Sequence, residues 1–271
     1  MFSRLLVSVA CAGCQVVFPL RDRAEVTPPP TTCPDDHGAP RFDTVLTKVI
    51  DDTCTLYSEA PDTDLAVCSN VIDVLTQGPI GMAPVPALFD PPLAAHTLFT
   101  ATVHPEGDQL TALLYLEGSG ATIEVYRQVA TAWQHVATSP SVGNAMMGIP
   151  SRGPDARMMV YDPNRMMVVE LAQATDGGWT SVATTMPEQF GTVRPLSSMM
   201  NLSPDGRRVI FRTADKNIGY AFRNTVDEPF AEASLIDAPA HEAATWVVMS
   251  EECEQLAGSF ATGGVYVAPQ R

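Results

Sequence analysis

The chain has 271 residues, 45% of them hydrophobic, which is enough for one large all-β domain or two average domains. Only 17% of the residues are charged and 23 are proline, a composition that favours short strands and turns over long surface helices. The net charge of −15 argues against nucleic-acid binding, since phosphates attract lysine and arginine, and it gives no attraction to an anionic membrane.

The first segment has the pattern of an export signal. Arg4 supplies a positive charge, and residues 5–12 form a short apolar stretch. This stretch is much shorter than the roughly 20 residues that a membrane-spanning helix needs. We therefore expect residues 1–13 to be a cleaved signal peptide.

The string AGC at residues 12–14 resembles the lipobox of bacterial lipoproteins, with Cys11 where leucine is usual. The resemblance implies that the Cys14 thiol receives acyl chains such as palmitate and that Cys14 becomes the new N-terminus. Gln15 after the cysteine, in place of aspartate, implies the outer rather than the inner membrane. An ordinary cleaved signal and a retained anchor are the alternatives.

Residues 14–40 are expected to be a tether, because three consecutive prolines at 28–30 favour an extended, semi-rigid chain. The remainder, residues 41–271, is expected to be the folded domain. No other segment is apolar enough to span a bilayer.

The cysteine count also indicates export. If Cys11 leaves with the signal and Cys14 is acylated, four cysteines remain, and an even number in an oxidising compartment predicts two disulfides. Sequence alone leaves the pairing open; we favour Cys54–Cys68 within the first repeat and Cys33–Cys253 between the chain ends. A zinc site is disfavoured because the chain has no Cys-x-x-Cys pair.

An internal repeat of about fifty residues is the strongest signal. Its clearest copy is NLSPDGRRVIFRT, residues 201–213. Pro204 presets φ, Asp205 caps the turn and Gly206 tolerates a positive φ, so this string predicts a tight turn. The Val-Ile-Phe run that follows is β-prone and suits a buried strand.

Four more copies are degenerate, and each places an acidic residue in the turn before an apolar strand. The text after each turn has room for about four strands per unit. The predicted turn anchors are Asp52, Glu106, Asp155, Asp205 and Glu252.

The string LSPDGRRVIF (202–211) resembles the blade motif of TolB-like propellers, also called WD-repeat-like. The resemblance extends over roughly residues 40–271 and implies an all-β propeller of five or six four-stranded antiparallel blades in the bacterial envelope. Members of that family mostly bind proteins or peptides. The resemblance further suggests that residues 42–50 supply the outer strand missing from the truncated last unit, with a Cys33–Cys253 disulfide reinforcing the closure.

No motif in the chain is typical of a catalytic centre. There is no GxSxG elbow, and Ser119 between two glycines is expected in a hairpin turn. The zincin-like start at His241-Glu242 fails because Thr245 stands where the second histidine should be. We expect scattered surface or loop positions for the five histidines: His37, His96, His104, His135 and His241.

Metal and cofactor sites are not expected. Methionine pairs at 146–147, 158–159, 166–167 and 199–200 suggest soft Cu(I) ligands, but adjacent strand residues point to opposite faces, so we expect methionine to fill gaps between blades. The acidic stretches 51–52 and 61–64 lack EF-hand spacing, so no calcium site is expected.

The sequence thus predicts an outer-membrane lipoprotein that faces the periplasm and contacts the membrane only through its lipid anchor. Its propeller is expected to be a non-catalytic scaffold for an unidentified envelope protein or peptide. The alternative is a propeller enzyme, a hydrolase or lyase, whose catalytic residues face the channel.

Overall fold

The computed structural model is all-β, and the 3-10 helix η1 (Pro187–Phe190) is the one helical element among the described residues. Those residues are 40–42, 47–50, 54–58, 65–68, 71–78, 81–86, 89–90, 97–103, 109–116, 120–130, 132–140, 146–148, 150–151, 155–162, 165–203, 205–213, 215, 217–236, 244–249, 255–260 and 265–269. The predicted fold class is confirmed at this level.

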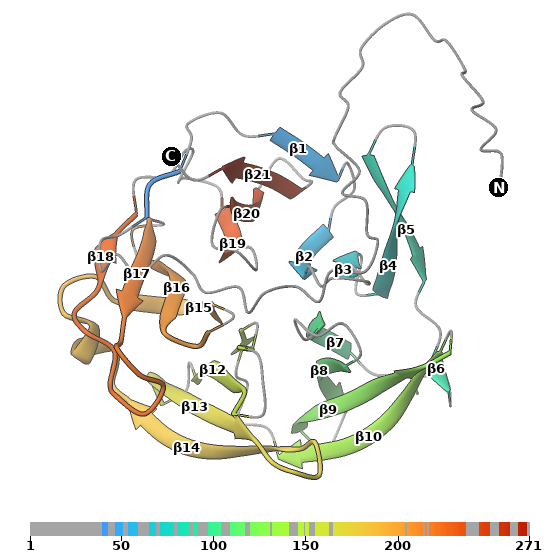
Figure 1. The fold of residues 1–271 in the computed structure, drawn as a ribbon, viewed down its shortest axis with the longest axis horizontal. Coiled ribbons are helices and arrows are strands. Elements are labelled where there is room, and N and C mark those ends of the chain that lie inside the picture. Colours follow the sequence, from blue (N-terminus) through green and yellow to red (C-terminus); the bar gives the residue numbers. More distant parts are fainter. Residues whose placement is uncertain are drawn as a thin grey trace, which may run out of the picture. The chain divides into compact units, whose positions relative to one another are not determined.

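The described strands form five sheets (Figure 1), here numbered along the chain. Sheet 1 is β2 (Cys54–Ser58), β3 (Leu65–Cys68), β4 (Val71–Gly78) and β5 (Gly81–Pro86). Sheet 2 is β7 (Thr97–Val103), β8 (Gln109–Leu116), β9 (Gly120–Val129), β10 (Ala132–Pro140) and β6 (Phe89–Asp90). Sheet 3 is β11 (Met146–Met147), β12 (Arg157–Asp162), β13 (Met167–Gln173) and β14 (Trp179–Thr185).

Sheet 4 is β15 (Pro195–Leu202), β16 (Arg208–Thr213), β17 (Ile218–Phe222) and β18 (Ser234–Leu235). Sheet 5 is β19 (Ala244–Met249), β20 (Gln255–Phe260), β21 (Val265–Pro269) and β1 (Thr47–Ile50). Neighbouring strands pair antiparallel, except that β6 runs parallel to β10. Most sheets are therefore up-and-down meanders of consecutive strands, so each repeat of about fifty residues corresponds to one sheet.

Sheet 5 combines the two ends of the folded domain. β1 pairs antiparallel with β21, and Lys48 stands opposite Tyr266. This confirms the prediction that residues 42–50 supply an outer strand to the last unit. The first strand of each sheet also contacts the next sheet: β2 meets β7, β7 meets β11, β11 meets β15, β15 meets β19, and β19 returns to β2. The sheets thus contact one another in a closed circuit.

Hydrophobic residues pack between neighbouring sheets with the strand period of two. Along β12, Met158 and Val160 join the cluster shared with sheet 2, whereas Met159 and Tyr161 join the cluster shared with sheet 4. All four are at most 2% exposed. Each central strand therefore has both faces in the core, which explains the near-continuous apolar runs that the repeat displays.

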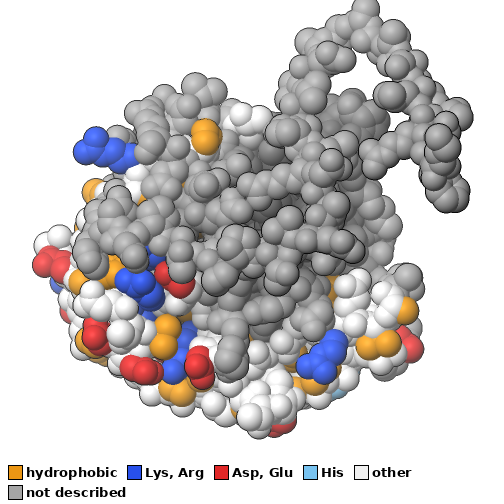
Figure 2. Space-filling model, viewed as in Figure 1, with side chains coloured by type: hydrophobic (Ala, Val, Ile, Leu, Met, Phe, Trp, Pro, Cys, Tyr) orange, Lys and Arg blue, Asp and Glu red, His pale blue; other side chains and the backbone are white. Residues whose placement is uncertain are grey.

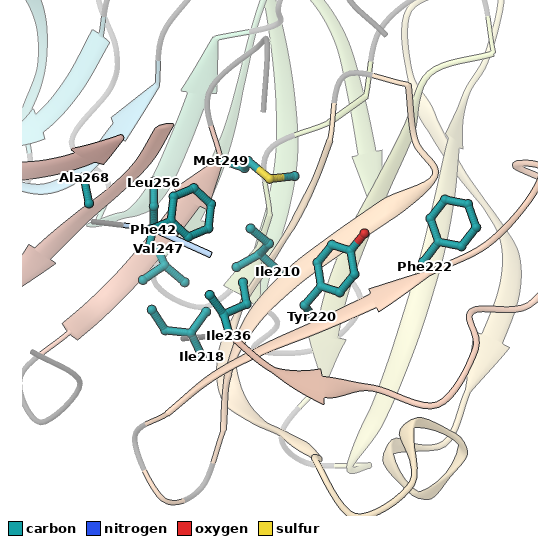
Figure 3. Packing of buried hydrophobic residues seen from close by; sticks show 10 residues of the cluster. All are labelled: Phe42, Ile210, Ile218, Tyr220, Phe222, Ile236, Val247, Met249, Leu256 and Ala268. Carbon is teal, nitrogen blue, oxygen red and sulfur yellow. The ribbon is translucent and has the colours of Figure 1, made fainter. Parts of the chain in front are cut away.

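Sheets 4 and 5 share the cluster drawn in Figure 3. Ile210 and Tyr220 come from sheet 4, and Val247 and Leu256 from sheet 5. Phe42, which precedes β1, is only 1% exposed in the same cluster. The N-terminal part of the folded domain is thus held in two ways: Phe42 is buried between the last two sheets, and β1 pairs with β21.

The inner strands are also linked by polar contacts. The side-chain amide of Asn201 in β15 donates a hydrogen bond to the carbonyl of Val247 in β19. Asn201 is 2% exposed, so this bond helps to satisfy the polar groups of a buried side chain.

Candidate functional site

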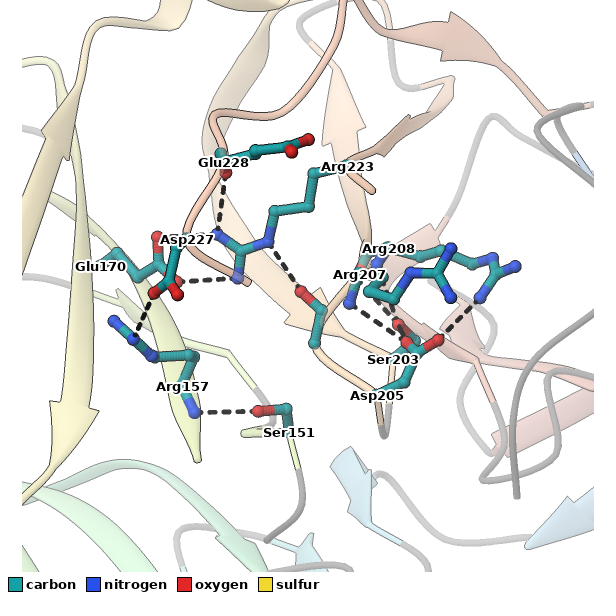
Figure 4. A network of polar contacts seen from close by, with 11 residues as sticks. Ser151, Arg157, Glu170, Ser203, Asp205, Arg207, Arg208, Arg223, Asp227 and Glu228 are labelled. Atoms are coloured by element: carbon teal, nitrogen blue, oxygen red, sulfur yellow. Dashed lines mark hydrogen bonds and ion pairs between the residues drawn. The ribbon is translucent and has the colours of Figure 1, made fainter. Parts of the chain in front are cut away.

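The clearest repeat turn is a self-contained cap between β15 and β16 (Figure 4). The Ser203 hydroxyl donates to Asp205 Oδ1 at 2.5 Å and accepts from the Arg208 backbone N–H at 2.9 Å. The Asp205 carboxylate also accepts from the Arg207 N–H at 3.1 Å and from Arg208 Nη1 at 3.0 Å. Gly206 has a φ of 67°, as the Pro-Asp-Gly sequence predicts. The acidic anchor therefore holds the turn together.

The corresponding turn in sheet 3 repeats the hydrogen bonds of the serine but not those of the aspartate. The Ser151 N–H donates to the Arg157 carbonyl at 2.8 Å, and the Arg157 N–H donates to Ser151 Oγ at 2.8 Å, as the Ser203–Arg208 pair does. One extra residue separates serine from arginine here, and Asp155 is exposed. The predicted anchor Asp155 therefore lies in a turn, as expected, but it projects into solvent.

Two charged residues link sheets 3 and 4. Arg223, directly after β17, donates from Nη2 to Glu170 Oε1 at 2.8 Å and from Nη1 to Glu170 Oε2 at 3.0 Å. Its Nε donates to the Gly206 carbonyl at 2.9 Å, and its guanidinium lies 4.4 Å from the ring centroid of Phe230. The side chains of Arg223 and Glu170 are 1% and 10% exposed. No motif in the sequence points to this pair.

The charged residues described so far form ion pairs within the chain. The two pairs are Asp205–Arg208 and Glu170–Arg223. Arg157 additionally pairs with the exposed Asp227 at 3.2 Å. These paired charges stabilise the turns and their contacts.

The strand order corrects one anchor. Glu106, Asp155, Asp205 and Glu252 fall between the first and second strands of sheets 2 to 5, although Glu106 and Glu252 lie outside the described residues. Asp52, also outside them, falls before the first strand of sheet 1, so its assignment as an equivalent anchor is wrong. The equivalent connection is residues 59–64, between β2 and β3, which contains Pro61-Asp62.

The backbone register bears on the cysteines. Cys54 in β2 stands directly opposite Cys68 in β3. Opposite residues of antiparallel strands have Cα atoms about 4.5–5.5 Å apart, within the range that a disulfide spans. Cys14, Cys33 and Cys253 lie outside the described residues, so the other pairing stays a prediction.

His135 is the described histidine, and it belongs to a small polar cluster in sheet 2. Its Nε2 lies 2.8 Å from Glu124 Oε2 and 3.1 Å from Thr138 Oγ1, and the Thr138 hydroxyl donates to the same Glu124 oxygen at 2.6 Å. A bulge at Val136 shifts the register of β10, which brings residues three apart to one carboxylate. His37, His96, His104 and His241 lie outside the described residues.

Two pKa values in this cluster are displaced. Partial burial tends to raise the pKa of Glu124, but the hydroxyls of Thr122 and Thr138 and the ring of His135 favour the carboxylate and hold its pKa below the ordinary value. Burial, and to a lesser degree the negative charge of Glu124, raises the pKa of Tyr126 to about 12. Glu124 is thus an ionised acceptor at neutral pH, with His135 as its exposed partner.

Other predictions about single residues can be placed as well. Met158, Met159 and Met200 are buried in clusters between sheets, as expected for methionine that fills gaps. Residues 117–119, with Ser119, connect β8 to β9 where Leu116 pairs with Gly120, so the hairpin is confirmed. The stretches 51–52 and 61–64 lie outside the described residues.

A depression of about 390 Å³ lies beside β17. Tyr220, Phe222, Asn224, Glu232 and Ser234 line it, and Glu232 is its one charged lining residue. Within the described residues, no three His, Cys, Asp or Glu side chains are grouped to hold a metal ion, and no helix is long and apolar enough to cross a membrane. Basic and acidic side chains are interspersed on the described part of the face in Figure 2.

Comparison with known proteins yields a fold. No known family profile matches the chain, and no curated protein matches it in sequence. A functionally unknown protein from Desulfotomaculum acetoxidans superposes with a TM-score of 0.51 at 12% identity, covering 78% of this chain and 62% of that protein. The chain therefore spans less than two thirds of that relative's length.

Two further structures are similar at lower scores. A protein from Lactobacillus plantarum gives a TM-score of 0.47 at 17% identity over 81% of this chain and 71% of that one. A candidate TolB from Agrobacterium tumefaciens gives 0.47 at 12% identity over 82% and 83%. At such low identity, similarity to the first protein shows the fold alone, and that fold is the propeller-type circuit of antiparallel sheets described above.

Proposed function

We propose that the protein is an exported, lipid-anchored scaffold whose five sheets are the blades of a TolB-like propeller, and that it binds an envelope protein or peptide without catalysing a reaction. In this proposal residues 1–13 are removed, Cys14 carries the lipid, residues 14–40 are the tether and residues 41–271 are the propeller. The protein then faces the periplasm from the outer membrane, as the resemblance of its N-terminal segment to a lipobox suggests.

One observation carries the non-catalytic role. Charged residues in and beside the clearest repeat turn are bonded within the chain: Arg223 and Glu170 form two hydrogen bonds, and Asp205 caps its own turn. A hydrolase or lyase needs groups held ready for a substrate. The repeat therefore supports a rigid frame, and a rigid frame suits the display of loops and strand edges to a partner.

The five-blade count has support of its own. The first strands of the five sheets contact one another in sequence, and the circuit closes through β19 and β2. Pairing of β1 with β21 removes an open edge at the point where the chain ends meet. A sixth blade would need strands between two sheets that already touch.

The binding role is tested by crosslinking in envelope extracts. The His-tagged propeller, residues 41–271, is incubated with the extract, treated with a short amine-reactive crosslinker and purified under denaturing conditions. A specific partner should be recovered with the native propeller and lost with a heat-denatured sample. Equal recovery from both samples, or repeated failure to recover any protein, contradicts the scaffold. Hydrolysis of envelope substrates by the purified chain would favour the enzyme instead.

The anchor is tested separately. Cells that express the full chain and are fed radioactive palmitate should label the protein, and Cys14→Ser should abolish the label. Labelling that persists in Cys14→Ser contradicts lipidation at this residue, while the binding proposal is unaffected.

A further inference from the structure

The outer strand of sheet 3 is exposed along most of its length. In β14, the five consecutive residues from Thr180 to Thr184 are all exposed. Its inner neighbour β13 pairs along one side, and no described strand pairs with the other side. The Trp179 N–H at the start of β14 donates to Ser139 Oγ of sheet 2 at 2.7 Å, and from Thr180 onward this side of the strand has no described strand as a partner.

Outer strands usually carry a device that prevents them from pairing with another chain. The other four sheets of the described region each have one: β1 carries Lys48, β5 carries Pro84 and Pro86, β10 is partly covered by β6, and β18 has only two residues. β14 reads WTSVATT, with no charge and no proline, and the one such device in it is a bulge at Val182. Its β-branched residues favour the extended conformation that strand pairing needs.

A bulge divides β14, because Glu170 pairs with Ala183 while Leu171 pairs with Ser181. Val182 is left between them, unpaired with β13 and 49% exposed. Beyond the bulge, residues Ala183 to Thr185 pair with β13 in regular register. Exposed apolar side chains flank this half, since Met186 directly follows β14 and is 47% exposed.

The exposed side chain of Met166 is a second feature that favours a binding surface beside β14. It is 56% exposed and has a φ of 50°, a conformation that glycine or asparagine adopts at lower cost. Val168 pairs with Thr185, so Met166 and Met186 lie at the same end of the β13–β14 pair. A long, flexible apolar side chain held exposed at a strained position suits contact with a partner better than it suits solvent.

We propose that the edge of β14, with Val182, Met186 and Met166 beside it, docks an extended, uncharged, β-branched peptide segment by strand addition. The proposal rests on the proposed binding function and names where and what the scaffold binds. Main-chain hydrogen bonds supply the affinity, and the three apolar side chains supply the preference for an aliphatic residue. An acidic segment is disfavoured because the chain itself carries a net charge of −15.

A second copy of the chain fits this edge less well. A strand of seven residues offers much less than the roughly 800 Å² per partner that a stable dimer buries. Two copies of a strongly acidic chain also repel each other. A short peptide segment needs neither a large area nor the approach of two acidic domains.

The test is selection of a phage-displayed library of random peptides, about twelve residues long, on the folded chain. Val182→Lys places a charge on the edge, and Val129→Lys is the matched control, because Val129 is 46% exposed on a different sheet. We expect enriched peptides rich in Val, Ile and Thr, at least tenfold weaker binding to Val182→Lys, unchanged binding to Val129→Lys, and slower amide hydrogen exchange in β14 when peptide is bound. Thr184→Lys repeats the test at a second position.

The outcomes separate the edge from the function. Enriched peptides that bind Val182→Lys and Thr184→Lys as well as the native chain overturn the β14 edge but leave a peptide-binding scaffold in place. A partner recovered from envelope extracts alongside a library that yields no peptide also overturns the edge. Failure of both experiments overturns the scaffold itself. A native chain that is dimeric in solution, with a monomeric Val182→Lys, assigns the edge to a second copy and contradicts the peptide.

Discussion

The guanidinium of Arg223 in sheet 4 donates two hydrogen bonds to the carboxylate of Glu170 in sheet 3, at 2.8 and 3.0 Å. The same guanidinium reaches the Gly206 carbonyl in the repeat turn. One arginine thus ties the turn of its own sheet to the third strand of the neighbouring sheet. Apolar packing between the two sheets is non-directional, so a buried two-point fork of this kind helps to fix how they are aligned.

Removing one partner of this pair should be severely destabilising. Glu170→Gln leaves the guanidinium buried without its counter-charge, and Arg223→Met leaves the carboxylate, so each should lower the free energy of unfolding by about 3–5 kcal/mol. The double variant should lose much less free energy of unfolding than the two single variants added together, because neither charge of the pair is then left buried alone. Urea unfolding of all four proteins measures this. Additive losses would mean that the two side chains do not act as a pair.

The two aspartates of the turns should behave differently. Asp205 accepts from Ser203 and Arg208, so Asp205→Ala should cost about 1–2 kcal/mol, the usual loss for a side chain that caps backbone N–H groups. Asp155 is exposed, and Asp155→Ala should change stability by less than about 0.5 kcal/mol. Thermal melts of the two variants make the comparison. Equal losses would contradict the different roles assigned to the two turns.

Local features of the fold were predictable from the sequence. The turn at Pro204–Gly206 follows from three adjacent residues with known φ preferences, and the burial of Val209, Ile210 and Phe211 follows from an apolar run. The same logic failed at Asp52, because an acidic residue before an apolar run occurs in front of a first strand as well as a second. The proline in Pro61-Asp62 was the signal that distinguishes the correct connection.

Polar side-chain contacts between distant residues were not predictable. Glu170 and Arg223 are 53 positions apart, and each alone reads as an ordinary surface charge. The Glu124–His135–Thr138 cluster depends on a bulge at Val136, whereas an alternating strand would place residues 135 and 138 on opposite faces. A bulge of this kind leaves no mark in the residue pattern.

Gly219 should not tolerate a side chain. A Cβ atom at this position would lie 2.3 Å from the ring of Phe211, which is fully buried. Gly219→Ala should therefore cost about 1–3 kcal/mol by overpacking. Combination with Phe211→Leu should recover part of the loss relative to Phe211→Leu alone. Chemical denaturation gives both values, and an undiminished cost in the Leu background would contradict the clash.

Glu124 should make stability depend on acid pH. Its folded pKa lies below the ordinary value of 4.5, so ionised Glu124 stabilises the fold above that pH, and the contribution disappears as the pH falls through the folded pKa. The stability difference between the native chain and Glu124→Gln should be present at pH 7 and shrink as the pH falls below 4.5. The exposed Asp155→Asn serves as the control. A difference that is constant with pH would show that the carboxylate charge is not what stabilises.

The register of β2 and β3 leads to a covalent prediction. Cys54 and Cys68 stand opposite each other in the backbone register, so we expect them to form a disulfide if the chain reaches an oxidising compartment. Non-reducing digestion and mass spectrometry of the exported protein should recover these two cysteines in one linked peptide pair. The Cys54→Ser/Cys68→Ser double variant should then lose about 2–4 kcal/mol, the usual contribution of a native disulfide. Recovery of Cys54 linked to Cys33, or free, would contradict the pairing, because strand register and disulfide would then demand incompatible positions for the same residue.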